Sequence, residues 1–319
     1  MFSKTALSIA LSSGLWIPVS LPAQMGMVSS VPFWPNGGDT SQLPKGQHIF
    51  FDLHAAEYVV YYAADSAAGQ VQPAMFRFGA HSLVQPEVTV AVASADDGRF
   101  HCMYQVENGA HARQSIQKII ILDYSDSSPR SAGGNWTAHV EVHKERDLGT
   151  SAMSASAIEW ISNSAAPSIA PGSAKQGLAI DSASLPGFVS MVFQAESKST
   201  EYTPEAVASL PQDVRDQLAS LMSPAHDQQS TMVIGPRFPK GASPSAIAQN
   251  YSFGLQWLIR RHKLDPNSPF VQRARELFDE QLQAGDQTVL TAASLDFTKQ
   301  ANPGMEATIA NALQSIFVQ

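Results

Sequence analysis

The sequence predicts an α+β multidomain protein, in which an antiparallel β-sandwich, immunoglobulin-like or jelly roll, is followed by an α-helical domain. Between residues 47 and 200, about ten short apolar runs are separated by turn-forming residues, with no helical spacing between them. Near Glu201 the apolar spacing changes to three or four residues, which is helical. The length of 319 residues suits two domains of roughly 100–200 residues each.

Residues 1–23 have the layout of a secretory signal peptide. Lys4 precedes an apolar and small stretch from Ala6 to Trp16, and a Pro-marked exit ends at Ala23. A buried N-terminal helix is the alternative, but Pro18 would stop it early. The apolar run is too short to span a membrane, so we expect a secreted or periplasmic chain with no transmembrane segment after cleavage. Residues 24–46, rich in Pro and Gly, are predicted to be a loop segment.

Cysteine content and charge narrow the classes of protein. Cys102 is the single cysteine, so no internal disulfide can form, and export then favours a bacterial periplasm or cell surface over a disulfide-rich ectodomain. We interpret Cys102 as a small core hydrophobe. The net charge of −8, without clusters of Lys and Arg, argues against nucleic acid as a partner.

The first predicted strands are rich in aromatic and β-branched residues. They cover His48–Leu53, Glu57–Ala63, Met75–Phe78 and Glu87–Ala93. A tight turn at Asp96-Asp97-Gly98 then leads into the next strand.

The stretch Phe100–Tyr124 is predicted to be the centre of the sandwich. From Phe100 to Val106 apolar and polar residues alternate, which indicates a half-buried strand. Asn108-Gly109 forms a turn, and the nearly continuous apolar run Ile116–Leu122 indicates a strand covered on both faces. Further strands are predicted at Trp136–Val142, Ala157–Ile161, Gly177–Ile180 and Gly187–Ala195.

The predicted α-helical domain covers residues 201–319. Thr203-Pro204 begins a helix that extends to about residue 222. An irregular connection follows, with one short extended piece at Thr231–Ile234. Four more helices are expected from apolar residues spaced three or four apart, in the ranges Ile247–Ile259, Phe270–Leu282, Leu290–Phe297 and Met305–Ile316. Short connections between them favour antiparallel neighbours.

A set of turn and core residues carries a resemblance to a known class of modules. These are Trp160, Ile169, Pro171-Gly172, Gly177 and Leu185-Pro186-Gly187, with Tyr104, Val106 and Asn108 before Gln114-Ser115-Ile116. Through them, residues 46–196 resemble the β-sandwich modules of secreted bacterial proteins of unassigned activity, which are broadly immunoglobulin-like. The resemblance implies a fold and an export route, and it carries over no catalytic residue.

One strand contains a candidate metal site. His139, Glu141 and His143 are two residues apart, so their side chains share one face, and a further His, His111 or His101, would complete a Zn²⁺ or other transition-metal site. The alternative is the solvated face of an outer strand whose other face is Ala138, Val140 and Val142. We favour the solvated face, because surface strands alternate in this way routinely.

Other reactive patterns are weaker. Asp96-Asp97 and the pair Asp123 and Asp126 have the residue types of a glycosidase or a Ca²⁺ site, but turn capping explains them better. Ser115 and Lys118 match a Ser-x-x-Lys motif in letters, yet they open a predicted strand and not a helix. The sequence has no Gly-x-Ser-x-Gly elbow, His-Glu-x-x-His motif or phosphate loop. Exposed aromatics would offer a platform for sugar rings, although core packing is favoured for most of them; the six are Trp34, Trp136, Trp160, Tyr58, Tyr61 and Tyr62.

These observations favour an exported, non-catalytic binding or structural module of the bacterial periplasm or cell surface. Its ligand would be a carbohydrate or a protein; no cofactor is expected, and the oligomeric state is open. The alternative is a hydrolase, with carbohydrate as a candidate substrate class, whose site lies where the sandwich meets the helices. A deep polar cleft at that junction would favour the enzyme, and a shallow seam would favour the module.

Overall fold

The computed structural model describes residues 31–35, 38–63, 73–80, 83–95, 97–123, 127–130, 136–143, 155–163, 168–196, 207–208, 210–222, 228–285 and 287–317. The predicted signal peptide and the first part of the predicted loop segment lie outside these ranges. Their structure is therefore not described, and export stays a prediction.

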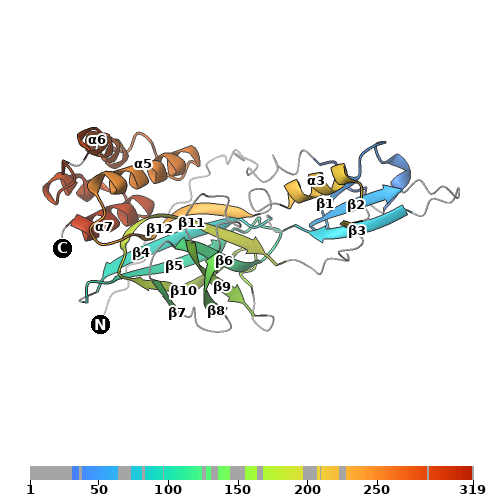
Figure 1. The fold of residues 1–319 in the computed structure, drawn as a ribbon, viewed down its shortest axis with the longest axis horizontal. Coiled ribbons are helices and arrows are strands. Elements are labelled where there is room, and N and C mark those ends of the chain that lie inside the picture. Colours follow the sequence, from blue (N-terminus) through green and yellow to red (C-terminus); the bar gives the residue numbers. More distant parts are fainter. Residues whose placement is uncertain are drawn as a thin grey trace, which may run out of the picture.

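Two antiparallel sheets form the central sandwich (Figure 1). Sheet B has the order β4 (Pro86–Ser94), β5 (Phe100–Asn108), β10 (Ser173–Ser182) and β7 (Ser127–Arg130). Sheet C has the order β12 (Gln229–Phe238), β11 (Leu185–Ala195), β6 (Ile116–Asp123), β9 (Ala155–Ser162) and β8 (Trp136–His143). The prediction of antiparallel sheets together with helices is confirmed.

The stretch from Phe100 lies at the centre of the sandwich, as predicted. Along β5, buried residues alternate with more exposed ones. Tyr104 of sheet B contacts Trp160 of sheet C, with ring centroids 6.1 Å apart, and Ile119 and Ile121 of β6 are fully buried in the same core. Asn108 is not only a turn former. It is fully buried, donates to the Gln114 and Ile169 carbonyls, and accepts from the Gln85 N–H.

The first three strands form a sheet of their own, which differs from their predicted place in the sandwich. Sheet A has the order β1 (Ile49–Asp52), β2 (Glu57–Ala63) and β3 (Pro73–Gly79), and a 3₁₀-helix, η1 (Thr40–Gln42), precedes it. One face of sheet A packs against Leu210, and against Val214 and Leu218 of helix α3 (Gln212–Leu221). A helix from the far part of the chain thus covers the apolar face that a second sheet would otherwise cover.

The remaining helices match the predicted positions closely. They are α5 (Pro244–Arg260), α6 (Pro269–Ala284) and α7 (Met305–Phe317), while the predicted helix near residue 293 is a 3₁₀-helix, η2 (Ala293–Gln300). The Ser243 hydroxyl accepts from the Ala246 N–H and Pro244 takes the first helical position, which fixes the start of α5. No helix in the described ranges is both long and apolar enough to cross a membrane.

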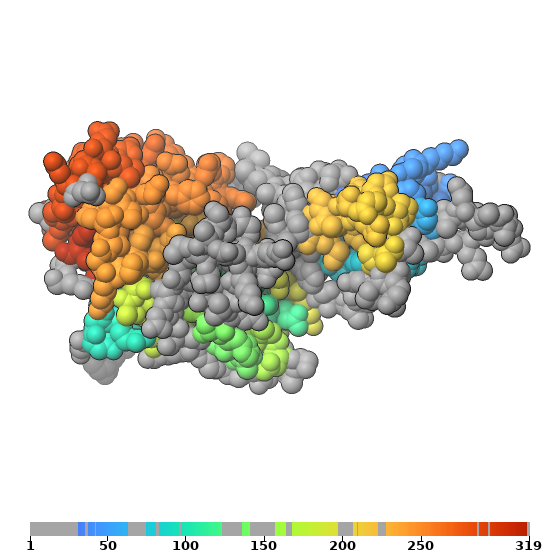
Figure 2. All heavy atoms as spheres, in the orientation of Figure 1, coloured from blue at the N-terminus to red at the C-terminus, as the bar shows by residue number. Residues whose placement is uncertain are grey.

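The part of the chain after residue 200 contributes to the sandwich, to sheet A and to the group of helices at the end of the sandwich. The short extended piece predicted at Thr231–Ile234 is the middle of β12, a ten-residue strand that pairs with β11. Helix α3 covers sheet A, whereas α5–α7 share the sandwich core. Figure 2 shows the resulting elongated shape, with the helices α5–α7 (orange to red) at one end and α3 (yellow) beside the first strands (blue) at the other.

Contact between α5 and the sandwich depends on three neighbouring residues of the helix, Asn250, Tyr251 and Gly254. The Asn250 amide accepts from the Phe188 N–H (2.7 Å) and donates to the Phe188 carbonyl (2.9 Å). Tyr251 packs edge-on against the Phe188 ring. At Gly254 an added Cβ would lie 2.1 Å from the Phe188 ring, so only glycine fits there. Burial raises the pKa of the Tyr251 phenol, whose hydroxyl donates to the Pro186 carbonyl.

Candidate functional site

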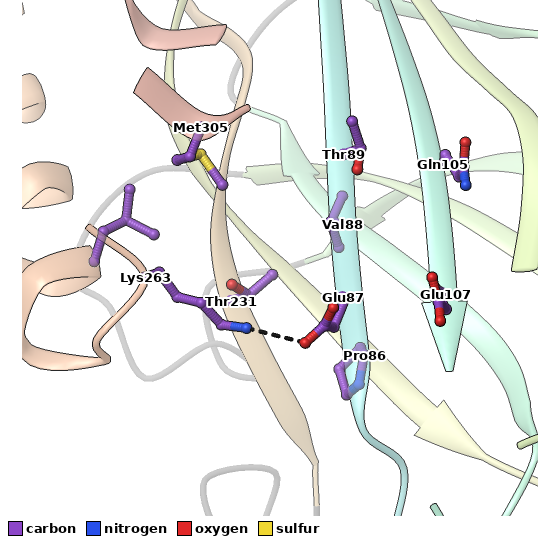
Figure 3. Close-up of a pocket in the computed structure, with 10 residues that line it drawn as sticks. Pro86, Glu87, Val88, Thr89, Gln105, Glu107, Thr231, Lys263 and Met305 are labelled. Carbon is purple, nitrogen blue, oxygen red and sulfur yellow. Dashed lines mark hydrogen bonds and ion pairs between the residues drawn. The ribbon is translucent and has the colours of Figure 1, made fainter. Parts of the chain in front are cut away.

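A small pocket lies where the sandwich meets the helices, the place predicted for a hydrolase site. It encloses about 150 Å³ between strands β4 and β5, strand β12, and the ends of α5 and α7. Figure 3 shows Glu87 and Glu107 on neighbouring strands, with Lys263 and Met305 approaching from the helical side. The lining is mostly polar.

Strand register brings the two carboxylates together. Glu87 of β4 lies directly opposite Glu107 of β5. Like charges in this position destabilise a sheet. Lys263 Nζ, 3.3 Å from Glu87 Oε1, offsets part of that repulsion. The Glu87 and Lys263 side chains are 66% and 49% exposed, so this pair contributes little to stability.

Size and exposure argue against catalysis in this pocket. Small-molecule sites usually enclose roughly 300–1,000 Å³, and the 150 Å³ here is well below that range. A glycosidase acid works from an apolar, water-poor pocket, whereas Glu87 is mostly in water. The pocket has the polarity expected of an enzyme site without its depth.

The His139 face contains one buried acid that the sequence did not single out. His139 of β8 is exposed and lies directly opposite Glu159 of β9, whose side chain is 1% exposed. Lys118 Nζ lies 2.6 Å from Glu159 Oε2. Glu141 and His143 continue β8 opposite Ala157 and Ala155, but their side chains are outside the described set. A metal at this face therefore stays a prediction, and Lys118 already neutralises the nearest carboxylate.

The proposed fourth ligands lie elsewhere. His101 is on the solvent-facing side of sheet B, where its Nδ1 lies 2.5 Å from Asp181 Oδ1. His139 is on the solvent-facing side of sheet C, so the sandwich core separates the two imidazoles. His111 is exposed in the turn after β5. Among the described side chains, no group of three His, Cys, Asp or Glu is arranged to hold a metal ion.

The remaining sequence candidates have structural roles where they are described. Asp97 accepts from the Arg99 N–H, so the predicted turn capping is confirmed for this acid, while Asp96 and Asp126 lie outside the described residues. Asp123 ends β6. Cys102 is fully buried, as predicted for a core hydrophobe. Ser115 directly precedes β6, and Lys118 lies within that strand, paired with Glu159.

Three of the six aromatic residues considered for a sugar-binding platform are buried in the core. Trp136, Trp160 and Tyr58 are at most 5% exposed. Trp34 packs on Phe50 and Tyr61, with centroid distances of 5.6 and 5.9 Å. Only Trp34, Tyr61 and Tyr62 stay partly accessible, all of them around sheet A.

The face of sheet A opposite α3 contains an ion cluster that sequence reasoning missed. Arg77 of β3 donates to Asp52 Oδ2 (3.0 Å) and Glu57 Oε2 (2.9 Å). Burial opposes ionisation of Asp52, but hydrogen bonds from the Ala55 N–H, the Arg77 guanidinium and the His54 N–H outweigh it and lower the pKa of Asp52. Burial likewise opposes the charge of Arg77, yet its two carboxylate partners raise its pKa. Pairing β1, β2 and β3 as successive hairpins would have brought these three residues together.

Sheet A and its surroundings also present exposed apolar side chains. Phe33 is 57% exposed, Leu53 41% and Met75 48%. Met75 is on the outer strand β3, whereas Phe33 and Leu53 lie beside and after β1. Met103, Val140, Phe253 and Leu282 are also exposed, on the sandwich and the helices, so the exposed apolar side chains around sheet A are separate positions and not one patch.

Comparison with known proteins adds a likeness in fold. No protein family model matches the chain, and no curated protein does. A solved structure of an uncharacterized protein from Nocardia farcinica, described as having an immunoglobulin-like fold, is similar at 11% sequence identity. The similarity covers 46% of this chain and 96% of that one, with a TM-score of 0.26. That protein is described as the class of module that the sequence resembles, but similarity at this level supports no statement about the fold or activity of this chain.

Proposed function

We propose that this protein is an exported, non-catalytic module that acts by contact, as a binding or structural component of the bacterial periplasm or cell surface. The observation that carries the proposal is the contrast between the pocket and the sheet A surface. The pocket is small and its acid Glu87 is mostly exposed, whereas sheet A ends in an outer strand, β3, whose Met75 side chain is exposed.

Export is supported by residues 1–23, whose charged start, apolar middle and Pro-Ala exit are typical of a signal peptide. The test is expression of the full chain in a bacterial host, followed by fractionation and mass measurement of the purified protein. We expect periplasmic or secreted protein that lacks about the first 23 residues, as the signal pattern predicts. A cytoplasmic protein with an intact N-terminus would contradict export.

The absence of catalysis is tested with a panel of glycoside, ester and peptide substrates. We expect no turnover by the purified mature protein. The pocket variants Glu87→Gln and Glu107→Gln serve as the matched comparison. Hydrolysis that either substitution abolishes would replace this proposal with the hydrolase at the sandwich–helix junction.

Carbohydrate binding is tested on a glycan array with the wild type and Trp34→Ala. Because Trp34 packs against Phe50 and Tyr61, we expect its ring face to be a poor platform and no glycan to be retained. Retention that Trp34→Ala abolishes would make the module a lectin. Retention that survives the substitution would place any sugar site away from Trp34.

A further inference from the structure

Strand β3 is the outer strand of sheet A, and the opposite edge of the sheet is already occupied. Along that opposite edge, the Phe51 N–H donates to the Pro32 carbonyl and the Trp34 N–H to the Phe51 carbonyl, both at 2.9 Å. At the β4 edge of the sandwich, the Thr308 hydroxyl of α7 donates to the Val90 carbonyl. Other segments thus contact the β1 and β4 edges, and the sandwich has further outer strands in β7, β8 and β12. In sheet A, no described segment pairs with the outer side of β3.

Two residues of β3 direct their backbone N–H and carbonyl groups away from β2. The Tyr61 N–H donates to the His48 carbonyl at 2.8 Å, so the Tyr61 backbone faces β1. Met75 is the β3 residue opposite Tyr61, so its own N–H and carbonyl point away from β2. The same alternation turns the backbone of Arg77 outward. Within the described ranges, neither residue makes a backbone hydrogen bond along this outer edge.

The side chains of β3 do not block pairing with another strand. Natural edge strands are usually protected by lysine, proline, bulges or covering segments, and β3 has one of these, Pro73, at its first position only. Arg77 is the only charged residue of β3, and its guanidinium is turned across the sheet toward Asp52 and Glu57. Met75 is 48% exposed, and Phe76 is a partly buried residue against the sheet A core. Among the described residues, the edge therefore has no partner strand, and its exposed side chain Met75 is apolar.

We propose that β3 pairs antiparallel with β3 of a second copy of this chain, about a two-fold axis at Phe76. Phe76 is the middle residue of the seven in β3, so this register sets all seven residues opposite a partner residue, although Pro73 at the strand end has no N–H to donate. Met75 then lies opposite Arg77 of the partner subunit. A shift of the axis to Arg77 would set two arginines directly opposite each other, which is unfavourable.

The proposed register also extends the core. Phe76 lies on the α3 face of sheet A, so the two Phe76 rings would meet across the axis and continue the apolar layer of each copy. An isologous contact of this kind closes on itself as a dimer. Because a single strand from each subunit buries less than the roughly 1,200–2,000 Å² of stable interfaces, the dimer is weak and reversible.

This inference rests on the proposed function, because it names the partner at the sheet A end. Different experimental results would overturn the proposed function and the proposed dimer. Hydrolysis by the pocket would overturn the proposed function without affecting strand pairing, and a protein that stays monomeric would overturn the dimer without making the protein an enzyme.

Cysteine cross-linking of the mature protein tests the register. Residues on the axis of a non-hydrogen-bonded antiparallel pair have Cα atoms about 4.5 Å apart, within the range of about 4.4–6.8 Å that a disulfide spans. We expect Phe76→Cys to give the most covalent dimer under mild oxidation, with less from Arg77→Cys. The native Cys102 is fully buried and adds no background. Met103→Cys, at a site 43% exposed on the sandwich, is the control for random collision.

Sedimentation velocity at increasing protein concentration tests the contact without new cysteines. We expect wild type to shift toward a dimer as concentration rises, and Met75→Lys to abolish the shift by placing a cation opposite Arg77 of the partner subunit. Met103→Lys, the matched control, should sediment like wild type. A wild type that is monomeric at every concentration, or Met103→Cys cross-linking as well as Phe76→Cys, would overturn the proposal.

Discussion

The sandwich region and sheet A each bury an apolar sheet face, but different parts of the chain cover the two faces. In the sandwich, helices α5–α7 join a core that contains Tyr104 and Trp160. Sheet A has a separate core with α3, built from Phe51, Val60 and Leu218 among others. The sandwich region thus has a sheet partner and three helices, whereas sheet A depends on one helix.

The difference between the two cores suggests which region is the scaffold and which region contacts a partner. Where α5 meets the sandwich, the packing is tight at Gly254, which lies against the Phe188 ring. Sheet A keeps exposed Met75, Leu53 and Phe33 around a smaller core. We interpret the sandwich with α5–α7 as the scaffold and sheet A with α3 as the contacting part.

The largest expected effect comes from a matched pair of core truncations. Phe188→Ala and Phe51→Ala each remove a ring that is 1% exposed, at a cost of about 3–5 kcal/mol. Because the cores are separate, we expect Phe51→Ala to raise amide hydrogen exchange in β1–β3 and α3 while the sandwich stays protected. Phe188→Ala should raise exchange in the sandwich and α5 together. Equal loss of protection across the whole chain in both variants would show one cooperative unit and break the comparison.

Gly254→Ala is expected to destabilise the sandwich region by about 1–3 kcal/mol, the usual cost of overpacking. In an exposed helix the same change would stabilise, because alanine is the better helix former by about 1 kcal/mol. Here the added Cβ would lie 2.1 Å from the Phe188 ring. Chemical denaturation measures the change, and Ser252→Ala on the same helix is the control. A stabilised Gly254→Ala would mean that α5 docks less tightly than described.

Acid is expected to weaken sheet A before it affects the scaffold. The pKa of Asp52 is lower in the fold than its unfolded value of about 3.9. Its stabilising contribution is therefore complete above about pH 4 and is lost as the pH falls through the folded pKa. Amide hydrogen exchange in β1–β3 should therefore become faster as the pH falls below about 4, after correction for the intrinsic exchange rate. We expect Asp52→Asn to reduce this pH dependence. Asp279→Asn, at an exposed site on α6, should leave the pH dependence of exchange in β1–β3 unchanged. The same pH dependence in wild type and Asp52→Asn would contradict a stabilising role for the Arg77, Asp52 and Glu57 cluster.

Local patterns predicted the elements well. Alternation from Phe100 to Val106 predicted a buried central strand, and the apolar spacing from Ile247 to Ile259 predicted α5, which begins three residues earlier at Pro244. Such features depend on neighbours in the chain. Asp97 as a turn cap and Cys102 as a core residue follow from the same local rules.

The missed features all depend on contacts between distant segments. That β1–β3 leave the sandwich follows from α3, more than a hundred residues later, covering them. The short extended piece at Thr231–Ile234 becomes a full strand because β11 offers an edge to pair with. Arg77 meets Asp52 and Glu57, and Glu159 meets Lys118, only through strand register, which periodicity alone does not supply.

Amide exchange along β3, measured residue by residue by NMR at low and high protein concentration, tests the central claim most directly. Phe76 directs its backbone toward β2, so its N–H should stay protected at both concentrations. We predict that the outward N–H groups of Met75 and Arg77 exchange fast in dilute protein and slow down when it is concentrated. Exchange at Met75 and Arg77 that does not change with concentration would contradict sheet A as the contacting end of the molecule.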